Sequence, residues 1–458
     1  MTVSNTKTLF EKIWDAHHVA YTGTGASLIA IDRVFLHERT GAAALKSMAA
    51  ASRPVRDPAR VFAVMDHIVD TRPGRGDGTL MKGGSAFITE TRAAAKAAGI
   101  TLFDVNDRDQ GITHVISPEL GIVLPGVTLV APDSHTCTQG ALGALAWGIG
   151  SSEAEHAMAT GVLRLDRPKT MRVTYKGRLA PGVTAKDMIL ALIAAHGAGG
   201  GVGHVVEFAG EAVRALDVEA RMTLCNMATE FAAMTGIIAP DAKTFEYLAG
   251  RRYAPEDFGE PYWHTLKTDE GARFDREIEI DAAALAPMVS WGTSPEHAMP
   301  VDGTVPQGPA RAHEYIGLAA GGKLLGTPID VAFIGSCTNA RLSDLRRAAA
   351  LLKGRRIAPS IRKAMVVPGS SAVKRAAEAE GLDKVFTDAG FEWRASGCSL
   401  CFFAGGEHFP DGSRTMSSTN RNFEGRQGPG IRTHIASPET VVASALAGAI
   451  ADPRELAR

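Results

Sequence analysis

The chain has 458 residues, of which 45% are hydrophobic and 22% charged, and its formal net charge is −1. This length predicts about two to four domains, and the balanced charge lacks the basic excess that binding to a nucleic-acid backbone requires. No apolar run reaches the roughly 18 residues of a membrane helix, Met1–Asn5 does not begin a secretory signal, and five cysteines make a poor disulfide scaffold, so we expect a cytoplasmic protein.

Residues 1–168 alternate apolar runs with helical patterns. Four runs have the length and composition of buried strands: Leu28–Asp32, Val61–Met65, Thr101–Val105 and Val127–Ala131. A helix is predicted over Ala86–Ala98, and Ser152 and Glu155 have the spacing of a capping box that opens another helix. Glycine and proline interrupt Arg72–Gly84, which is therefore predicted to be a loop. This alternation predicts an α/β fold with a parallel sheet.

Polar residues follow two of these predicted strands. Asp66 and His67 come directly after one strand, Asp133 and His135 come after another, and His114 lies between them. Ligands of parallel α/β sheets bind beyond the carboxyl ends of the strands. A carboxylate beside an imidazole tunes its pKa and fixes its tautomer, so these five residues are candidate acid–base groups. Purely structural histidines are the alternative interpretation.

The middle of the chain, residues 169–296, is predicted to form a second α/β domain. Thr184 caps a predicted helix over Ala185–Ala195. Asn226 and Glu230 are four residues apart, which would place them on one face of a helix. Residues 293–325 are rich in Gly, Pro and Ala and are predicted to be a linker into a third domain, 297–458.

Three of the five cysteines lie in the last third of the chain, between predicted strands and helices. Cys337 follows the predicted strand Ile329–Ile334 and precedes the predicted helix Leu342–Leu352, a position that we expect to favour the thiolate. Cys398 and Cys401 form a C-x-x-C pair. Three thiolates leave a structural zinc site one ligand short, whereas on a four-iron cube they leave one iron open as a Lewis acid.

Other uses of these thiols remain open, because buried inert cysteines or a thioredoxin-like pair would give a similar spacing. Cys137 and Cys225 are predicted to be small packed residues. Asn420, Arg421 and Arg426 lie in a polar loop, and arginine forks match carboxylates in a bidentate manner, so this loop is a candidate carboxylate site. A solvated surface loop is the alternative for it.

Four segments carry a resemblance to a known family: Gly335–Asn339, Gly397–Cys401, Asp133–Thr136 and Asn420–Arg426. Together they resemble the aconitase superfamily, and the resemblance covers nearly the whole chain. It implies three α/β/α domains, with mainly parallel sheets, packed around a [4Fe-4S] cluster. It also implies a dehydration and rehydration reaction in which one iron takes the substrate carboxylate and hydroxyl.

The resemblance implies a role for each candidate residue. The three irons that are not open to substrate would be bound by Cys337, Cys398 and Cys401. The remaining roles concern protons and substrate: Asp66 with His67 for the departing hydroxyl, His114 with Asp133 as a second pair, His135 near the open iron, Asn226 and Glu230 to position His135 or a bound water, and Asn420, Arg421 and Arg426 for the cluster and the substrate carboxylates.

Within the superfamily, the chain is most similar to large subunits that isomerise 2-isopropylmalate to 3-isopropylmalate through isopropylmaleate in leucine biosynthesis. The segments that carry this similarity are Thr8–Trp14, Ile31–Arg33, His204–Phe208 and Thr223–Met227. The chain ends at Arg458 without the family's swivelling domain, so the resemblance implies a separate small subunit that carries it. That domain supplies a serine base and an arginine for the distal carboxylate, and the large subunit alone is expected to be inactive.

Three departures from the family pattern concern the substrate. Phe402–Gly406 stands where these large subunits usually have Leu-Ala-Met-Asn, Cys137 stands where a small Ser or Ala is usual, and the Arg72–Gly84 loop differs. A paralogous dehydratase of another substituted malate, of the citramalate, dimethylmalate or homoaconitate type, is therefore the alternative. An RNA-binding protein that senses its cluster is a second alternative, against which the near-neutral charge counts.

Overall fold

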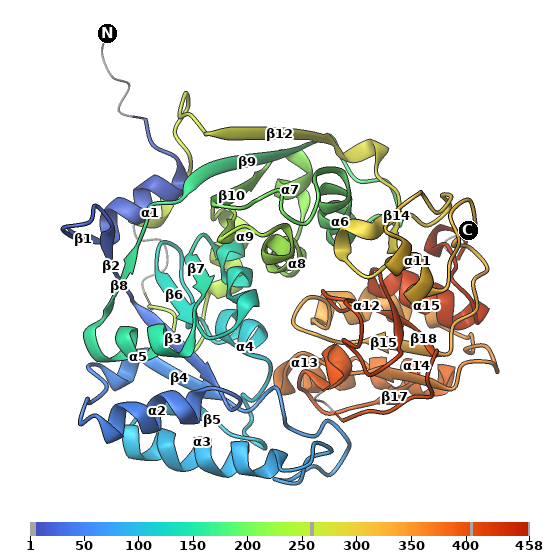
Figure 1. Cartoon of the computed structure of the whole chain (residues 1–458), viewed down its shortest axis with the longest axis horizontal. Coiled ribbons are helices and arrows are strands. Elements are labelled where there is room, and N and C mark those ends of the chain that lie inside the picture. Colours follow the sequence, from blue (N-terminus) through green and yellow to red (C-terminus); the bar gives the residue numbers. More distant parts are fainter. Residues whose placement is uncertain (1–5, 257–260, 404–405, 457–458) are drawn as a thin grey trace.

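The structure is a computed structural model that describes residues 6–256, 261–403 and 406–456. Three sheets with parallel strands occupy three separate parts of the molecule in Figure 1: β3–β5 at the lower left, β9 and β12 along the top, and β15 to β18 at the lower right. Helices pack on the faces of these sheets. This arrangement confirms the predicted mainly parallel α/β fold class.

The first sheet has the strand order β5-β4-β3-β6-β7, and all four of its pairings are parallel. Its central strands are buried on both faces, which explains their continuous apolar sequences. The elements of this region are α1 (Leu9–His17), β1 (His18–Tyr21), β2 (Ser27–Ala30), β3 (Arg33–His37), α2 (Gly41–Ala50), β4 (Val61–Val64), α3 (Gly84–Ala98), β5 (Thr101–Phe103), α4 (Thr113–Glu119), β6 (Thr128–Ala131), the 3-10 helix η2 (Ser134–Leu142), β7 (Leu145–Gly148), α5 (Ser151–Thr160) and β8 (Val162–Leu165).

Two predictions for this region need correction. The predicted strand Leu28–Asp32 corresponds to β2, which belongs to a small antiparallel sheet, β1-β2-β8, and the parallel sheet uses β3 instead. The predicted capping box of α5 is also wrong. Because the helix begins at Ser151, Gly150 is the N-cap, and its backbone N–H donates to Glu153 Oε2 at 2.7 Å.

The second sheet has the order β11-β10-β9-β12, again with parallel pairings. The predicted cap at Thr184 is confirmed, since Asp187 Oδ2 accepts from the Thr184 backbone N–H at 2.7 Å where α6 begins. The elements here are β9 (Lys169–Lys176), α6 (Ala185–His196), β10 (His204–Ala209), α7 (Glu211–Ala215), α8 (Val218–Asn226), the 3-10 helix η3 (Met227–Phe231), β11 (Thr235–Ile237), α9 (Ala242–Leu248), α10 (Pro261–Thr265) and β12 (Arg276–Asp281).

The third sheet has the order β17-β16-β15-β18-β19 and is parallel throughout. The predicted helix over Leu342–Leu352 is confirmed as α12 with the same bounds. The elements are β15 (Val331–Ile334), α12 (Leu342–Leu352), β16 (Lys363–Val366), α13 (Ser371–Ala379), α14 (Leu382–Ala389), β17 (Glu392–Trp393), β18 (Arg414–Ser417), β19 (Arg432–Ile435) and α15 (Pro438–Ala447).

The predicted linker 293–325 is a packed part of the fold. It contains β14 (Ala298–Pro300), which pairs with β13 (Met288–Ser290), and the helix α11 (Ala310–Ile316). Val301 and Leu324 are fully buried in the core of the third region. The Gly- and Pro-rich composition therefore marks turns between short elements and not a free connection.

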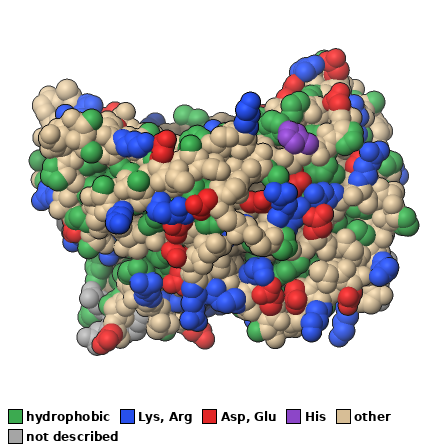
Figure 2. All heavy atoms as spheres, turned by 90° about the horizontal axis from the view of Figure 1, so that it is seen from below, with side chains coloured by type: hydrophobic (Ala, Val, Ile, Leu, Met, Phe, Trp, Pro, Cys, Tyr) green, Lys and Arg blue, Asp and Glu red, His purple; other side chains and the backbone are tan. Residues whose placement is uncertain are grey.

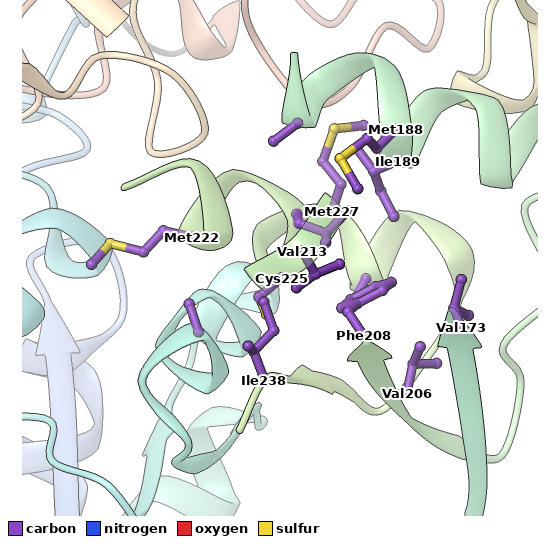
Figure 3. Packing of buried hydrophobic residues seen from close by; sticks show 14 of the residues in the cluster. Val173, Met188, Ile189, Val206, Phe208, Val213, Met222, Cys225, Met227 and Ile238 are labelled. Atoms are coloured by element: carbon purple, nitrogen blue, oxygen red, sulfur yellow. The ribbon is translucent and has the colours of Figure 1, made fainter. Parts of the chain in front are cut away.

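The largest core joins the second sheet to the 3-10 helix η2 of the first region. In Figure 3, Met188 and Ile189 of α6 point toward Phe208 and Val206 of β10. Each large sheet takes its strands from one of the predicted segments, and we propose 1–168, 169–296 and 297–458 as the domains on that basis. No helix among the described residues is long and apolar enough to cross a membrane.

Candidate active site

A cavity of about 310 Å³ lies where the carboxyl ends of β3, β4 and β6 face the loops that follow β15, β17 and β18. Loops from two sheets that are far apart in the chain therefore line one space. The cavity brings together most of the predicted site residues: His67, His114, Asp133, His135, Cys337, Cys398, Cys401, Arg421 and Arg426. It is also lined by residues that were not predicted, including His37, Arg39, Ser134 and Phe402.

Asp66, His67, Asp133 and His114 form one hydrogen-bonded chain. His67 Nδ1 lies 2.5 Å from Asp66 Oδ1, and its Nε2 lies 3.1 Å from Asp133 Oδ2. The other oxygen of Asp133 lies 2.9 Å from His114 Nε2. Asp66 is fixed in turn by the backbone N–H and the hydroxyl of Thr113, which donate to its Oδ2 at 3.0 and 3.1 Å. The two predicted acid–base pairs are thus one network.

The charges of this network stabilise one another. Burial alone would lower the pKa of His67, but Asp66 and Asp133 raise that pKa well above its usual value of 6.5. Burial alone would raise the pKa of Asp133, but His114 and the hydrogen bonds from the histidines lower it well below 3.8. His67 therefore stays protonated at neutral pH while Asp133 stays ionised, a combination that suits a proton donor held by a fixed base.

His37 and Glu38 are supporting residues that were not predicted. Glu38 accepts the backbone N–H groups of Asp66 and Ile68 at 3.1 and 2.5 Å and so fixes the turn that carries His67. The His37 ring stacks on His67 with 4.1 Å between the ring centroids. Both residues come at the carboxyl end of β3, so the strand-end rule would have found them if this strand had been recognised.

Glu230 joins the histidines to the loop that carries Arg421 and Arg426, called the arginine loop below. Its Oε1 lies 2.9 Å from His135 Nε2 and accepts a hydrogen bond from Arg421 Nε at 2.6 Å. Burial alone would raise the pKa of Glu230, but His135 and Arg421 lower it. The predicted shared helix face is wrong, because α8 ends at Asn226 and Glu230 lies in η3. The turn between them still directs both side chains to the site.

The amides of two asparagines surround the first cysteine. Asn226 Nδ2 donates to Cys337 Sγ at 3.2 Å, and Asn420 Nδ2 lies 3.5 Å from the same sulfur. Arg426 approaches the third thiol, with 3.6 Å between its guanidinium nitrogen and Cys401 Sγ. Donors of this kind stabilise sulfur that carries negative charge, as in cluster-bound thiolates.

The three sulfurs are spread too widely for a single zinc ion. Zinc binds thiolates at about 2.3 Å, which brings the sulfurs of one site within about 4 Å of each other. Among the described residues, Cys337, Cys398 and Cys401 do not form a group whose ligand atoms all lie within 4.8 Å of one another. The donor set therefore fits a larger inorganic cluster better than a single ion.

Burial overturns the expectation that Cys337 is a thiolate on its own. Burial, followed by the charge of Cys401, raises the pKa of Cys337 to about 11. The position of Cys337 between a strand and a helix is thus not sufficient to stabilise the thiolate, and a bound metal would be needed to do so. Ser336 and Ser399, which adjoin the cysteines, have φ angles of 84° and 47°, conformations that non-glycine residues rarely adopt. Such strain is typical of functional loops.

The other two cysteines are packed residues, as predicted. Cys137 is fully buried, and its thiol donates to the Asn226 carbonyl at 3.3 Å. Cys225 lies among the apolar side chains of the largest core, which Figure 3 shows around Ile238 and Met227.

Lys186 was not predicted and is fully buried beside the loops that follow β15 and β18. Its ammonium donates to the carbonyls of Ser418 and Thr419 at 2.9 and 2.6 Å and to Asn339 Oδ1 at 3.3 Å. Burial lowers the pKa of Lys186 to about 7. The sequence carries no signal that would predict the burial of Lys186, since a lysine in the first turn of a helix is ordinarily expected to be solvated.

Comparisons with known proteins relate the chain to one family. A family model described as "Aconitase family (aconitate hydratase)" matches residues 11–448. The 3-isopropylmalate dehydratase large subunit 1 of Bradyrhizobium diazoefficiens is 51% identical over 469 residues, which cover 99% of this chain and 97% of the relative. The 3-isopropylmalate dehydratase large subunit of Roseiflexus castenholzii is 49% identical over 474 residues, with 98% and 99% covered. A crystal structure of holo-form aconitase X from Thermococcus kodakaraensis superposes with a TM-score of 0.48 at 15% identity, over 86% of this chain and 84% of that chain.

Proposed function

Because the chain belongs to the aconitase family, we propose that it is the large subunit of a hydro-lyase that isomerises 2-isopropylmalate to 3-isopropylmalate through isopropylmaleate, in leucine biosynthesis. The observation that carries this proposal is the cavity in which three thiols, four histidines and three arginines meet. The names of two relatives of about half identical sequence support the same substrate.

The cofactor of the proposed reaction is one [4Fe-4S] cluster held by Cys337, Cys398 and Cys401. The amide donors to Cys337 and the wide spacing of the sulfurs support this assignment. When bound by three thiolates, such a cluster offers one iron as a Lewis acid toward the carboxylate and hydroxyl of the substrate.

The acid–base network would move the protons of the reaction. His67 is held protonated by Asp66 and Asp133, so it can donate a proton to the departing hydroxyl. His114 Nε2 lies 2.9 Å from Asp133 Oδ1, so this histidine can serve as a second proton site. Through its contact with His135, Glu230 orients that ring toward the same space.

The arginine loop would hold the substrate. Arg421 and Arg426 line the cavity, and their guanidinium groups match carboxylates in a bidentate manner. Asn420 would contact the cluster-binding cysteine and not the substrate, since its Nδ2 lies 3.5 Å from Cys337 Sγ and 2.9 Å from Thr338 Oγ1.

The active enzyme would be a complex with a small subunit that carries the swivelling domain, as the words "large subunit" in the relatives' names indicate. Nucleic acid is not proposed as a partner. The net charge is −1, and Figure 2 shows basic and acidic side chains intermixed on one face. We propose a cytoplasmic location and no membrane partner.

A second candidate is the same chemistry on another substituted malate, such as citramalate, dimethylmalate or a homoaconitate-type substrate. Phe402 favours it, because its ring lines the cavity at a position where the family usually has a leucine. The substrate branch would contact this part of the wall.

Anaerobic reconstitution with iron and sulfide, with and without the small subunit, tests the proposal. We expect a brown protein with cluster absorption that turns over 2-isopropylmalate only in the complex. Cys398→Ser should lose most of the absorption, whereas Cys225→Ala, which changes a packed cysteine outside the cavity, should keep it. A normal cluster in Cys398→Ser would refute the ligand assignment, and turnover of citramalate without turnover of 2-isopropylmalate would refute the substrate.

A further inference from the structure

Arg39 is an exposed arginine that lines the active-site cavity. Its guanidinium carbon lies 5.6 Å from the centroid of the Phe402 ring. That ring is largely buried, with 8% of its surface exposed, and its edge-on contact with the His67 ring, at 5.7 Å between centroids, fixes its place. Arg39 is therefore held against the cavity wall by a rigid aromatic platform.

The other two arginines of the cavity already have partners. Arg421 donates to Glu230 at 2.6 Å, and Arg426 lies 3.6 Å from Cys401 Sγ. Arg39 forms no ion pair and no side-chain hydrogen bond with any of the described residues. The N–H donors of its planar guanidinium group are therefore free to bind an anion in the cavity, where the proposed reaction places a dianion.

The Phe402 ring also contacts a second guanidinium group, that of Arg426. The guanidinium carbon of Arg426 lies 5.6 Å from the same ring centroid. The positive charges of Arg39 and Arg426 thus both lie against one ring in the wall of the cavity, where they favour an anion.

We propose that Arg39 binds a carboxylate of the substrate, with Phe402 as the residue that positions its guanidinium. The inference rests on the proposed function, since it takes the substrate to be a hydroxy-dicarboxylate. It assigns to the large subunit a substrate contact outside the acid–base network and the arginine loop. Arg39 would contribute to the binding of every substituted malate and not to the proton transfers.

The test compares the cluster-loaded complex of the wild type with the variants Arg39→Gln, Arg39→Lys and Phe402→Leu. Arg53→Gln is the matched control, because Arg53 is also exposed and lies just beyond the other end of α2, outside this cavity. Loss of one charge-assisted hydrogen-bonded contact should raise KM about 10- to 100-fold in Arg39→Gln. The value of kcat should stay nearly constant, since this contact is made equally in the ground state and the transition state.

The lysine variant keeps the charge without the fork and should fall between the wild type and Arg39→Gln. Phe402→Leu should raise KM by about threefold, because the ring no longer holds the guanidinium. Arg53→Gln should match the wild type. A KM for Arg39→Gln within twofold of that of Arg53→Gln would overturn the proposal, as would a fall in kcat at unchanged KM.

Equilibrium binding separates this inference from the proposed function. Calorimetric titrations of the complexes with 2-isopropylmalate, citramalate and malate should all show weaker binding in Arg39→Gln, whichever compound is turned over. If citramalate alone is a substrate, the proposed function fails while the role of Arg39 stands. Equal affinities in the wild type and Arg39→Gln, or no binding of any of the three dicarboxylates to the wild type, would sink the role of Arg39.

Discussion

At the scale of single residues, Asp133 is the centre of the acid–base network. It lies within hydrogen-bond distance of His67 and His114, at 3.1 and 2.9 Å, and accepts the backbone N–H of His135 at 2.8 Å. One carboxylate therefore fixes the rings of two histidines and the backbone of a third. Its charge also helps to keep the pKa of His67 high, so the network acts as a unit and not as separate pairs.

Asp133→Asn should change the pH dependence of catalysis. In the wild type the raised pKa of His67 keeps the ring protonated, so activity should fall only as the pH rises well above 6.5. The neutral amide removes one of the two anions that raise this pKa, and the fall should move toward lower pH. We also expect kcat to drop about 100-fold or more, as for loss of a positioned acid–base partner. The measurement is kcat/KM against pH.

Asp388→Asn is the control for this prediction, since Asp388 is an exposed residue of α14 outside the cavity. It should leave the profile unchanged. An Asp133→Asn profile that superposes on the wild type after scaling would show that Asp133 does not set the pKa of His67.

At the scale of elements, the Cys337 loop and the loop after β18 are fastened by a helix from another part of the chain. Lys186 lies in the first turn of α6, where the positive end of the helix disfavours a cation. Its contacts with two carbonyls and with Asn339 offset that cost. The ammonium thereby connects the second sheet region to the loops after β15 and β18.

Lys186→Met should destabilise the protein, because the carbonyls of Ser418 and Thr419 would be left buried without a donor. The expected loss is about 2–4 kcal/mol of unfolding free energy, measured by urea denaturation of the cluster-free chain. Lys46→Met is the control, since Lys46 forms an exposed ion pair with Glu90, and it should cost at most about 0.5 kcal/mol. Equal midpoints for the two variants would contradict this role of Lys186.

The sequence predicted elements well where a regular period coincided with clear ends. The helix Leu342–Leu352 has one apolar face, and its predicted first and last residues agree with the structure. Because β4 is buried on both faces, its sequence is a continuous apolar run that predicts a strand. The packed segment 293–325 was missed because its elements are too short for a period to appear. The hydrogen-bond partners of Asp133 and Glu230 lie up to 191 residues away in the chain, and no local pattern predicts such contacts.

At the scale of the whole molecule, the site depends on the way in which the three sheet regions meet. Glu230, from the second region, contacts His135 of the first region and Arg421 of the third. The cavity is lined by residues of the first and third regions, so the contacts of Glu230 lie behind its wall. A change in the relative position of the regions would therefore separate the acid–base network from the arginine loop.

Glu230→Gln should weaken this connection without leaving a cavity, because the two side chains have the same shape. We expect a loss of about 3 kcal/mol in unfolding free energy at neutral pH, as for breaking a largely buried ion pair. The pKa of Glu230 is lowered in the folded chain. The difference from the wild type should therefore be complete above its usual pKa of about 4.5 and shrink as the pH falls through the lower folded value. Urea denaturation at several pH values measures it, with Glu246→Gln in the exposed face of α9 as the control. A difference that is independent of pH would mean that the Glu230 charge does not join the three regions.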